Sequence, residues 1–72
     1  MIEVFETPLS SNIESLAYDP DLLELTVVFV SGAIYGHSGV PAHIWEALKN
    51  SVSVGKAYRN LVAKQYVMSR VE

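Results

Sequence analysis

The sequence predicts an α+β fold, in which a small three-stranded antiparallel sheet is followed by two helices that cover one of its faces. Three observations support this class. Residues 23–30 (LELTVVFV) alternate between two faces with a period of two, which is typical of a strand. Pro41 precedes a compact apolar stripe within His43–Lys49, and Ser53 precedes a second stripe that starts at Val54. The expected order of elements is therefore β-β-β-α-α.

The first two expected strands are separated by turn residues. Residues 12–18 (NIESLAY) are expected to form the first strand. The turn-forming sequence Asp-Pro-Asp at 19–21 ends this strand. In the second strand, residues 23–30, one face is fully apolar and must meet the core. The opposite face is polar at its start but ends in Val28 and Val30. We expect these two valines to be covered by the N-terminal arm or by a second copy of the chain.

A tight turn and a short helix are expected next. Ser31 and Gly32 fit a two-residue hairpin loop, because glycine supplies the positive φ that such loops require. Residues 33–37 then form the returning strand. The first helix is expected over His43–Lys49, and it must be short because the polar stretch NSVS at 50–53 interrupts it.

The second helix is expected to run from Val54 to about Met68, with Ser53 as its N-cap. Its apolar residues recur at helical spacing, so one face of this helix must meet the sheet. The large aromatic residues of both helices are expected in the core rather than in a cofactor site, because aromatic side chains bury the most area. These residues are Trp45, Tyr58 and Tyr66.

Length and composition indicate one small domain. The chain has 72 residues, half of them apolar, and no cysteine. Residues 1–9 read as an N-terminal arm or short edge strand, and residues 10–72 as the domain. The lack of cysteine fits a cytoplasmic protein, and the longest apolar runs fall far short of the ~20 residues that cross a bilayer. Because the core is small and one strand carries apolar residues on both faces, we expect a homodimer.

Charge is segregated along the chain in a way that the net charge of −3 conceals. Seven carboxylates and no lysine or arginine precede Lys49, whereas five basic residues and one carboxylate occur from Lys49 onward. One interpretation is a folded domain with a positive face that accepts an anionic ligand. The other is that the two halves lie side by side and their fields largely cancel. Both interpretations remain open on the sequence alone.

Several short stretches occur in a fixed order between residues 10 and 71. They are Ser11-Asn12-Ile13, Tyr18-Asp19, Leu25-Thr26-Val27-Val28-Phe29 with Gly32, Tyr35, Val40-Pro41, Leu48, Ser53-Val54-Gly55 and Tyr66. This order resembles the KTSC family, a small domain named for its occurrence at the C-terminus of some lysyl-tRNA synthetases and also found alone in bacteria and phages. The central Tyr-x-Tyr motif of that family reads Tyr35-Gly36-His37 here. The resemblance implies the family's fold and, through the synthetase connection, a role in binding RNA.

Two patterns suggest catalysis or metal binding but lack required residues. The sequence Gly-His-Ser-Gly at 36–39 lacks the final glycine of a nucleophile elbow, because position 40 is valine. It therefore reads as a strand-to-helix corner. His37, His43 and Glu46 could be combined as metal ligands, but two histidines without cysteine match no familiar ligand spacing. We therefore expect no enzyme activity, no metal and no cofactor.

The basic C-terminal part offers a binding surface of a more general kind. The sequence Ser-Val-Gly-Lys at 53–56 looks like the end of a phosphate-binding loop, but Asn50 and Ala57 occupy two positions that the motif requires to be Gly and Ser or Thr. It is either a helix start that accepts an anion or an ordinary cap. Lys56, Arg59 and Lys64 could contact phosphates, or could form a solvated helix face.

The expected function is a non-catalytic interaction module. Its ligand would be RNA, DNA, a nucleotide or an enzyme that handles them, with Tyr35 and His37 as stacking surfaces beside the basic helix. The expected binding residues are Tyr35, His37, Ser38, Ser53, Lys56, Arg59 and Lys64. The alternative is an inhibitor or adaptor directed at a protein, of the compact kind that phages encode against host defence proteins.

Overall fold

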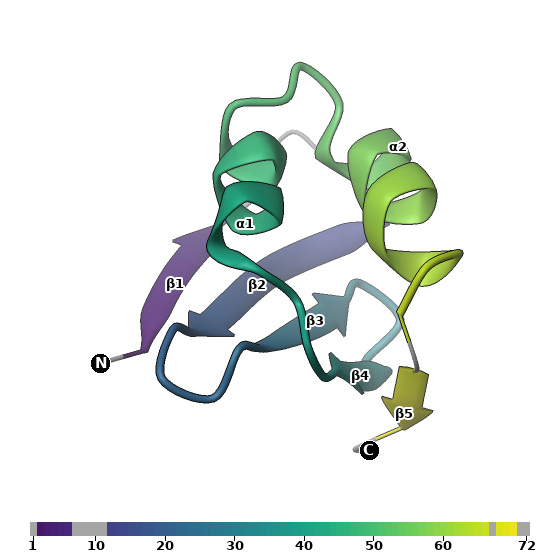
Figure 1. The fold of residues 1–72 in the computed structure, drawn as a ribbon. Coiled ribbons are helices and arrows are strands. Elements are labelled where there is room, and N and C mark those ends of the chain that lie inside the picture. Colours follow the sequence, from purple (N-terminus) through teal and green to yellow (C-terminus); the bar gives the residue numbers. More distant parts are fainter. Residues whose placement is uncertain (1, 7–11, 67, 71–72) are drawn as a thin grey trace.

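The computed structural model describes residues 2–6, 12–66 and 68–70. Its described strands form one antiparallel sheet in the order β1-β2-β3-β4-β5 (Figure 1). The strands are β1 (Glu3–Glu6), β2 (Ile13–Asp19), β3 (Glu24–Phe29), β4 (Ile34–His37) and β5 (Met68–Arg70). The helices are α1 (Ala42–Lys49), α2 (Val54–Tyr58) and a π-helical turn, η1 (Arg59–Ala63), that continues α2. The predicted α+β class is confirmed, but the prediction of three strands is wrong, because the sheet has five in the described ranges.

The first additional strand comes from the expected N-terminal arm. β1 pairs with β2 from Glu3 opposite Tyr18 to Glu6 opposite Ser15, and so extends the sheet at one edge. A four-residue edge strand needs little apolar surface, and its burial pattern is mostly exposed. Residues 3–6 of the arm therefore lie beside β2 in the plane of the sheet. The expected cover of Val28 and Val30 by the rest of the arm lies outside the described residues.

The second additional strand replaces the expected end of the second helix. The helical segment ends at Lys64 rather than near Met68, and β5 pairs with β4 from His37 opposite Met68 to Tyr35 opposite Arg70. The sequence YVMSRV at 66–71 contains two valines, and β-branched residues favour strands over helices. Pairing with the free edge of β4 therefore outweighs the continuation of the helical pattern.

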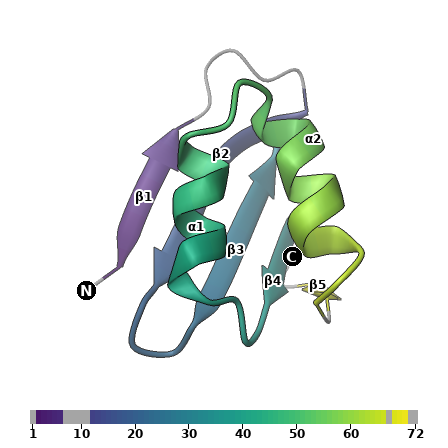
Figure 2. The same cartoon turned by 45° about the horizontal axis from the view of Figure 1, so that its top comes forward.

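The core lies between the sheet and the helices, which cover one face as predicted (Figure 2). α1 lies over β2, where the Trp45 and Tyr18 rings stack with centroids 5.4 Å apart. The Tyr18 hydroxyl donates to the Val40 carbonyl oxygen at 2.6 Å. Trp45 and Tyr58 are buried as predicted, and Tyr66 is half-buried against the same cluster. The buried apolar residues are Ile13, Leu16, Tyr18, Leu25, Val27, Val40, Trp45, Leu48, Tyr58 and Val62.

The connections follow the expected turn chemistry with one correction. The β3–β4 loop spans residues 30–33 rather than two residues, and it closes where the Phe29 amide donates to the Ala33 carbonyl oxygen at 2.9 Å. Gly32 has a φ of +98°, so a glycine is required in this loop as predicted, though with a longer span. Pro41 is the N-cap of α1. None of the helices in the described ranges has the length and apolar character needed to cross a bilayer.

Candidate functional site

Among the described side chains, the exposed lysine and arginine residues lie on the segment formed by α2 and η1, which we call the basic segment (residues 54–64). Lys56, Arg59 and Lys64 are all exposed on it, whereas Tyr58 and Val62 are buried on its other side. No ion pair joins these three cations to any carboxylate in the described part of the chain. Three positive charges within nine residues therefore face solvent with no ion-pair partner among the described carboxylates, which favours contact with an anionic partner.

Ser53 is the N-cap of α2, which confirms the predicted start of this helix. Its hydroxyl oxygen accepts from the Lys56 amide at 3.5 Å, and its carbonyl oxygen accepts from the Ala57 amide at 3.0 Å. The side chain thus satisfies a backbone N–H that would otherwise lack an intrahelical partner. This is the geometry of an ordinary cap, and the expectation that the helix start accepts an anion stays a prediction.

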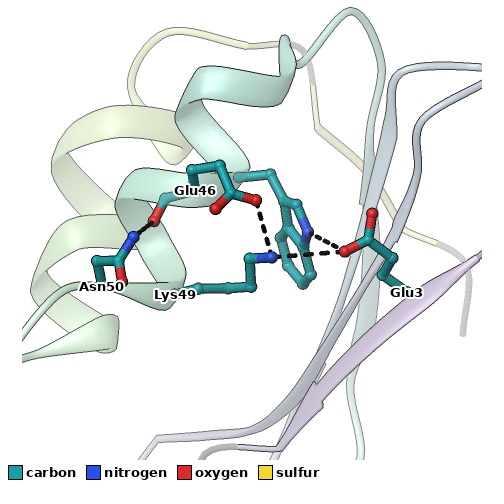
Figure 3. A network of polar contacts seen from close by, with 5 residues as sticks. Glu3, Glu46, Lys49 and Asn50 are labelled. Atoms are coloured by element: carbon teal, nitrogen blue, oxygen red, sulfur yellow. Dashed lines mark hydrogen bonds and ion pairs between the residues drawn. The ribbon is translucent and has the colours of Figure 1, made fainter.

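Lys49 shows how a cation of the same basic half can instead be neutralised. Its Nζ lies 2.8 Å from a Glu46 carboxylate oxygen and 3.4 Å from Glu3 Oε1 (Figure 3). Glu3 Oε1 also accepts from the Trp45 indole N–H at 3.2 Å. The Lys49 ammonium lies 5.2 Å from the centroid of the Trp45 ring, within range of a cation–π contact.

These contacts perturb both charged groups of the cluster. The hydrogen bond from Trp45, followed by the contacts with Lys49, lowers the pKa of Glu3 below its ordinary value of 4.5. The hydrogen bond to Glu46 is the largest cause of the raised pKa of Lys49, and Glu3 adds to it. Acidic and basic halves of the chain therefore do meet at Lys49, while the basic segment keeps its charges exposed.

Beneath the basic segment lies a cluster of aromatic rings that includes His37. Phe29 makes edge-to-face contacts with Tyr35 and Tyr58, at centroid separations of 5.5 and 5.9 Å. His37 makes a third edge-to-face contact with Tyr58, at 5.4 Å. The side chain of His37 is only 1% exposed, so it is a core residue. The expectation that its ring is a stacking surface for a ligand is therefore wrong.

A short hydrogen bond joins His37 to the basic segment. His37 Nε2 lies 2.7 Å from the Tyr58 hydroxyl oxygen, which lies 3.9 Å from the Met68 sulfur. A neutral His37 that donates from Nε2, with the Tyr58 proton directed at the sulfur, satisfies both contacts. Burial, with a smaller effect of Tyr35, raises the pKa of Tyr58, so its hydroxyl keeps its proton at neutral pH. The cluster thus ties β4, α2 and β5 together.

The remaining predicted site residues lie apart from one another. Tyr35 is half-buried on the core side of β4, and Ser38 is exposed at the corner that leads to α1. At this corner Gly39 has a φ of +72°, which accounts for the glycine. His43 and Glu46 are both exposed on α1, whereas His37 is buried on β4. Among the described residues no group of three acidic or histidine side chains could hold a metal ion.

Sequence reasoning did not assign three residues their structural roles: Glu3, Tyr58 as partner of His37, and Met68. Glu3 and Lys49 are separated by 46 positions, and no local pattern relates them. A signal for His37 was present, because Tyr35 and His37 are two positions apart on a strand and must share one face. That face pairs with Val27 and Leu25 of the core strand, which places the imidazole in the interior.

The described fold defines a small α+β domain with an antiparallel sheet covered on one face by two helices. The KTSC domain model matches residues 9–66, more than half of the chain, and the chain belongs to the KTSC family. A protein of Stutzerimonas stutzeri (strain A1501), described as uncharacterized, is 37% identical over 57 residues, which are 79% of this chain and 80% of that protein. The crystal structure of the KTSC domain protein YPO2434 from Yersinia pestis superposes with a TM-score of 0.90, at 24% identity and with complete coverage of both chains.

The structural match extends beyond the family span. β1 precedes residue 9 and β5 follows residue 66, so both edge strands lie outside the residues that the family model matches. The Yersinia pestis protein is nevertheless similar over the whole chain, which supports the five-stranded architecture. At 24% identity this likeness concerns the fold alone.

Proposed function

We propose that this KTSC-family protein is a non-catalytic recognition module that binds single-stranded nucleic acid through the basic segment. The observation that carries the proposal is the exposure of Lys56, Arg59 and Lys64 without a carboxylate partner among the described residues. Phosphate contacts by lysine and arginine supply most of the affinity of sequence-independent binding. The carboxylates of the chain's first half that remain exposed lie on other elements. They are Glu3 and Glu6 on β1, Glu14 on β2, Asp21 in the β2–β3 turn, Glu24 on β3 and Glu46 on α1.

Two further features support this location. The basic segment contains the π-helical turn η1, and such turns are rare and occur frequently at functional sites. Tyr66, which is half-buried, follows Lys64 by two positions, so an aromatic ring lies close in sequence to the last of the three cations. Proteins that bind single strands combine such aromatic rings with basic grooves, because every base offers a face for stacking. The alternative of an inhibitor or adaptor directed at a protein stays a prediction from the sequence.

Fluorescence anisotropy with labelled single-stranded RNA, single-stranded DNA and duplex DNA tests the proposal. Three phosphate contacts predict a slope of log affinity against log salt concentration of about −2 for a single strand. A variant with Lys56→Gln, Arg59→Gln and Lys64→Gln should lose most of this binding and flatten the slope. Lys49→Gln is the matched control, because it removes one positive charge that Glu3 and Glu46 already neutralise.

Each binding outcome either supports or contradicts the proposed function. Binding to single strands that the triple variant abolishes and Lys49→Gln retains supports the proposal. Tighter binding to the duplex contradicts the choice of single strands. Failure to bind any of the three nucleic acids, or equal binding by the wild type and the triple variant, overturns the proposed function. Circular dichroism of each variant shows whether the fold is retained.

A further inference from the structure

The face of the sheet opposite the helices has a regular surface pattern. Strand pairing places Ala17 opposite Thr26 and Thr26 opposite Gly36, which forms a row of small residues across β2, β3 and β4. The adjacent row contains Val28 opposite Ile34. We call these the small-residue row and the Val28–Ile34 ridge. Because they are two residues apart on each strand, they run parallel at a spacing of about 6.8 Å.

The centre of this outer face carries no charged side chain. The small-residue row ends in Val4 on β1 and Ser69 on β5, and the row of the ridge continues through Ser15. Carboxylates lie at the margins, with Glu6 at the β1 end of the ridge row and Glu24 at the turn end of β3. An uncharged centre within a polar margin is the arrangement of protein–protein interfaces. In the described part of the chain, both helices lie on the other face, so no helix covers this one (Figure 2).

We propose that the outer face binds a second copy of this chain, with the ridge of each copy seated over the small-residue row of the other. A two-fold axis parallel to the rows and midway between them produces this arrangement. Val28 and Ile34 of each ridge then meet Thr26 and Gly36 of the partner, and Ser15 in the same row meets the partner's Ala17. The same contact occurs twice, as an isologous interface requires. The strands of the two sheets run along nearly the same line, which is the aligned packing of β-sandwiches with about 10 Å between sheets.

The available area decides how strong this dimer can be. The Cα atoms span 28 × 26 × 24 Å, so one side of the molecule offers at most about 700 Å² to a flat partner. A standard interface buries about 800 Å² per partner. The outer face therefore suffices for an association near the lower end of the specific range, and we expect dissociation constants in the micromolar range.

The charges at the margin predict the response to salt. Glu6 and Glu24 of the two copies have the same sign, and salt screens their repulsion. Added sodium chloride should therefore strengthen the dimer or leave it unchanged. A basic protein bound to this face, or a nucleic acid bound to the basic segment, would be weakened by the same salt. The salt response thus distinguishes the dimer from these other occupants.

Sedimentation equilibrium of the full chain, from micromolar to millimolar concentration and at low and high salt, tests the proposal. Val28→Lys should raise the dissociation constant by at least about tenfold, because each dimer would bury two unpaired ammonium groups. Val52→Lys is the matched control, since Val52 is fully exposed between the two helices, on the opposite side of the molecule. This control should leave the dimer unchanged.

Ala17→Leu gives a second and more specific test. It fills the small-residue row and should weaken the dimer, whereas association through unspecific apolar contact would become stronger, because the variant exposes more apolar surface. A monomer at all concentrations overturns the proposal. So does a dimer that is insensitive to Val28→Lys, strengthened by Ala17→Leu or weakened by salt. Thermal unfolding of each variant verifies that the monomer fold is intact, and none of these outcomes depends on nucleic-acid binding.

Discussion

Removal of one oxygen atom, by Tyr58→Phe, tests the role of the buried contact between β4 and α2. The Tyr58 hydroxyl lies 2.7 Å from His37 Nε2, and both side chains are at least 94% buried. Phenylalanine keeps the ring contacts with Phe29 and His37 but leaves Nε2 without this hydrogen bond. Leaving a buried polar group unsatisfied costs about 1–3 kcal/mol, more than the net value of a typical hydrogen bond.

That cost is large for a chain of this size. A domain of 72 residues has a free energy of unfolding of roughly 4–11 kcal/mol. The variant should therefore lose a substantial fraction of its stability, and its Tm should fall by about 4–8 °C for each kcal/mol lost. Urea unfolding followed by circular dichroism gives the free energy, and a thermal scan gives the Tm.

Tyr66→Phe is the matched control, because Tyr66 is half-buried and loses the same atom. It should change the free energy of unfolding by less than about 0.5 kcal/mol. The double variant His37→Leu with Tyr58→Phe removes both partners, so it should be more stable than the sum of the two single changes implies. If Tyr58→Phe is no more destabilising than Tyr66→Phe, or if the double-variant cycle shows no coupling, the reasoning is refuted.

Three further predictions follow from other contacts. Glu3→Gln should weaken the attachment of β1 to α1. In the wild type, the fluorescence of the single tryptophan, Trp45, should change as pH falls below 4.5, because the stability that a lowered carboxyl pKa contributes is lost as pH falls through the pKa of the folded state. The same pH profile in Glu3→Gln would contradict this. Burial raises the pKa of Tyr18 and Tyr58, so the unfolded chain loses these protons first and the free energy of unfolding should fall above about pH 10. Urea unfolding that gives the same free energy below and above this pH would contradict the prediction. Gly32→Ala should lower the free energy of unfolding by about 1–2 kcal/mol. The cause is the φ of +98° alone, since no atom lies within 4 Å of the added Cβ. An unchanged free energy in urea unfolding would refute this.

Elements with a long repeating pattern or with clear turn and cap residues at their ends were predictable from the sequence, and these include the short strand β4. The edge strand β5 was not predicted, and β1 was expected only as one of two alternatives for residues 1–9. The alternation in residues 23–30 covers four pairs of positions, and it located β3 to within one residue at each end. The cap at Ser53 located the start of α2. β1 and β5 have four and three residues, too few for a period of two to be distinguished from chance. Their positions depend on the free edges of β2 and β4, which exist only in the folded sheet.

The candidate site was predictable to the extent that it depends on local sequence. Lys56, Arg59 and Lys64 fall outside the apolar stripe of their helix, and their exposure follows from that pattern. The neutralisation of Lys49 does not, because Glu3 reaches it only through the pairing of β1 with β2. The burial of His37 was not predicted, because its ring was expected to be a stacking surface for a ligand, whereas a partner such as the Tyr58 hydroxyl makes burial possible.

The contacts of Glu3 set an order of events during synthesis of the chain. Its two partners follow it by 42 and 46 positions, so a ribosome must extend the chain through Lys49 before both can be reached. β1 is therefore held by Trp45 and Lys49 only after α1 has left the exit tunnel. Until then β1 is held only by its pairing with β2. In a nascent-chain experiment with successive stall points, β1 should therefore become protected only at the later stall points.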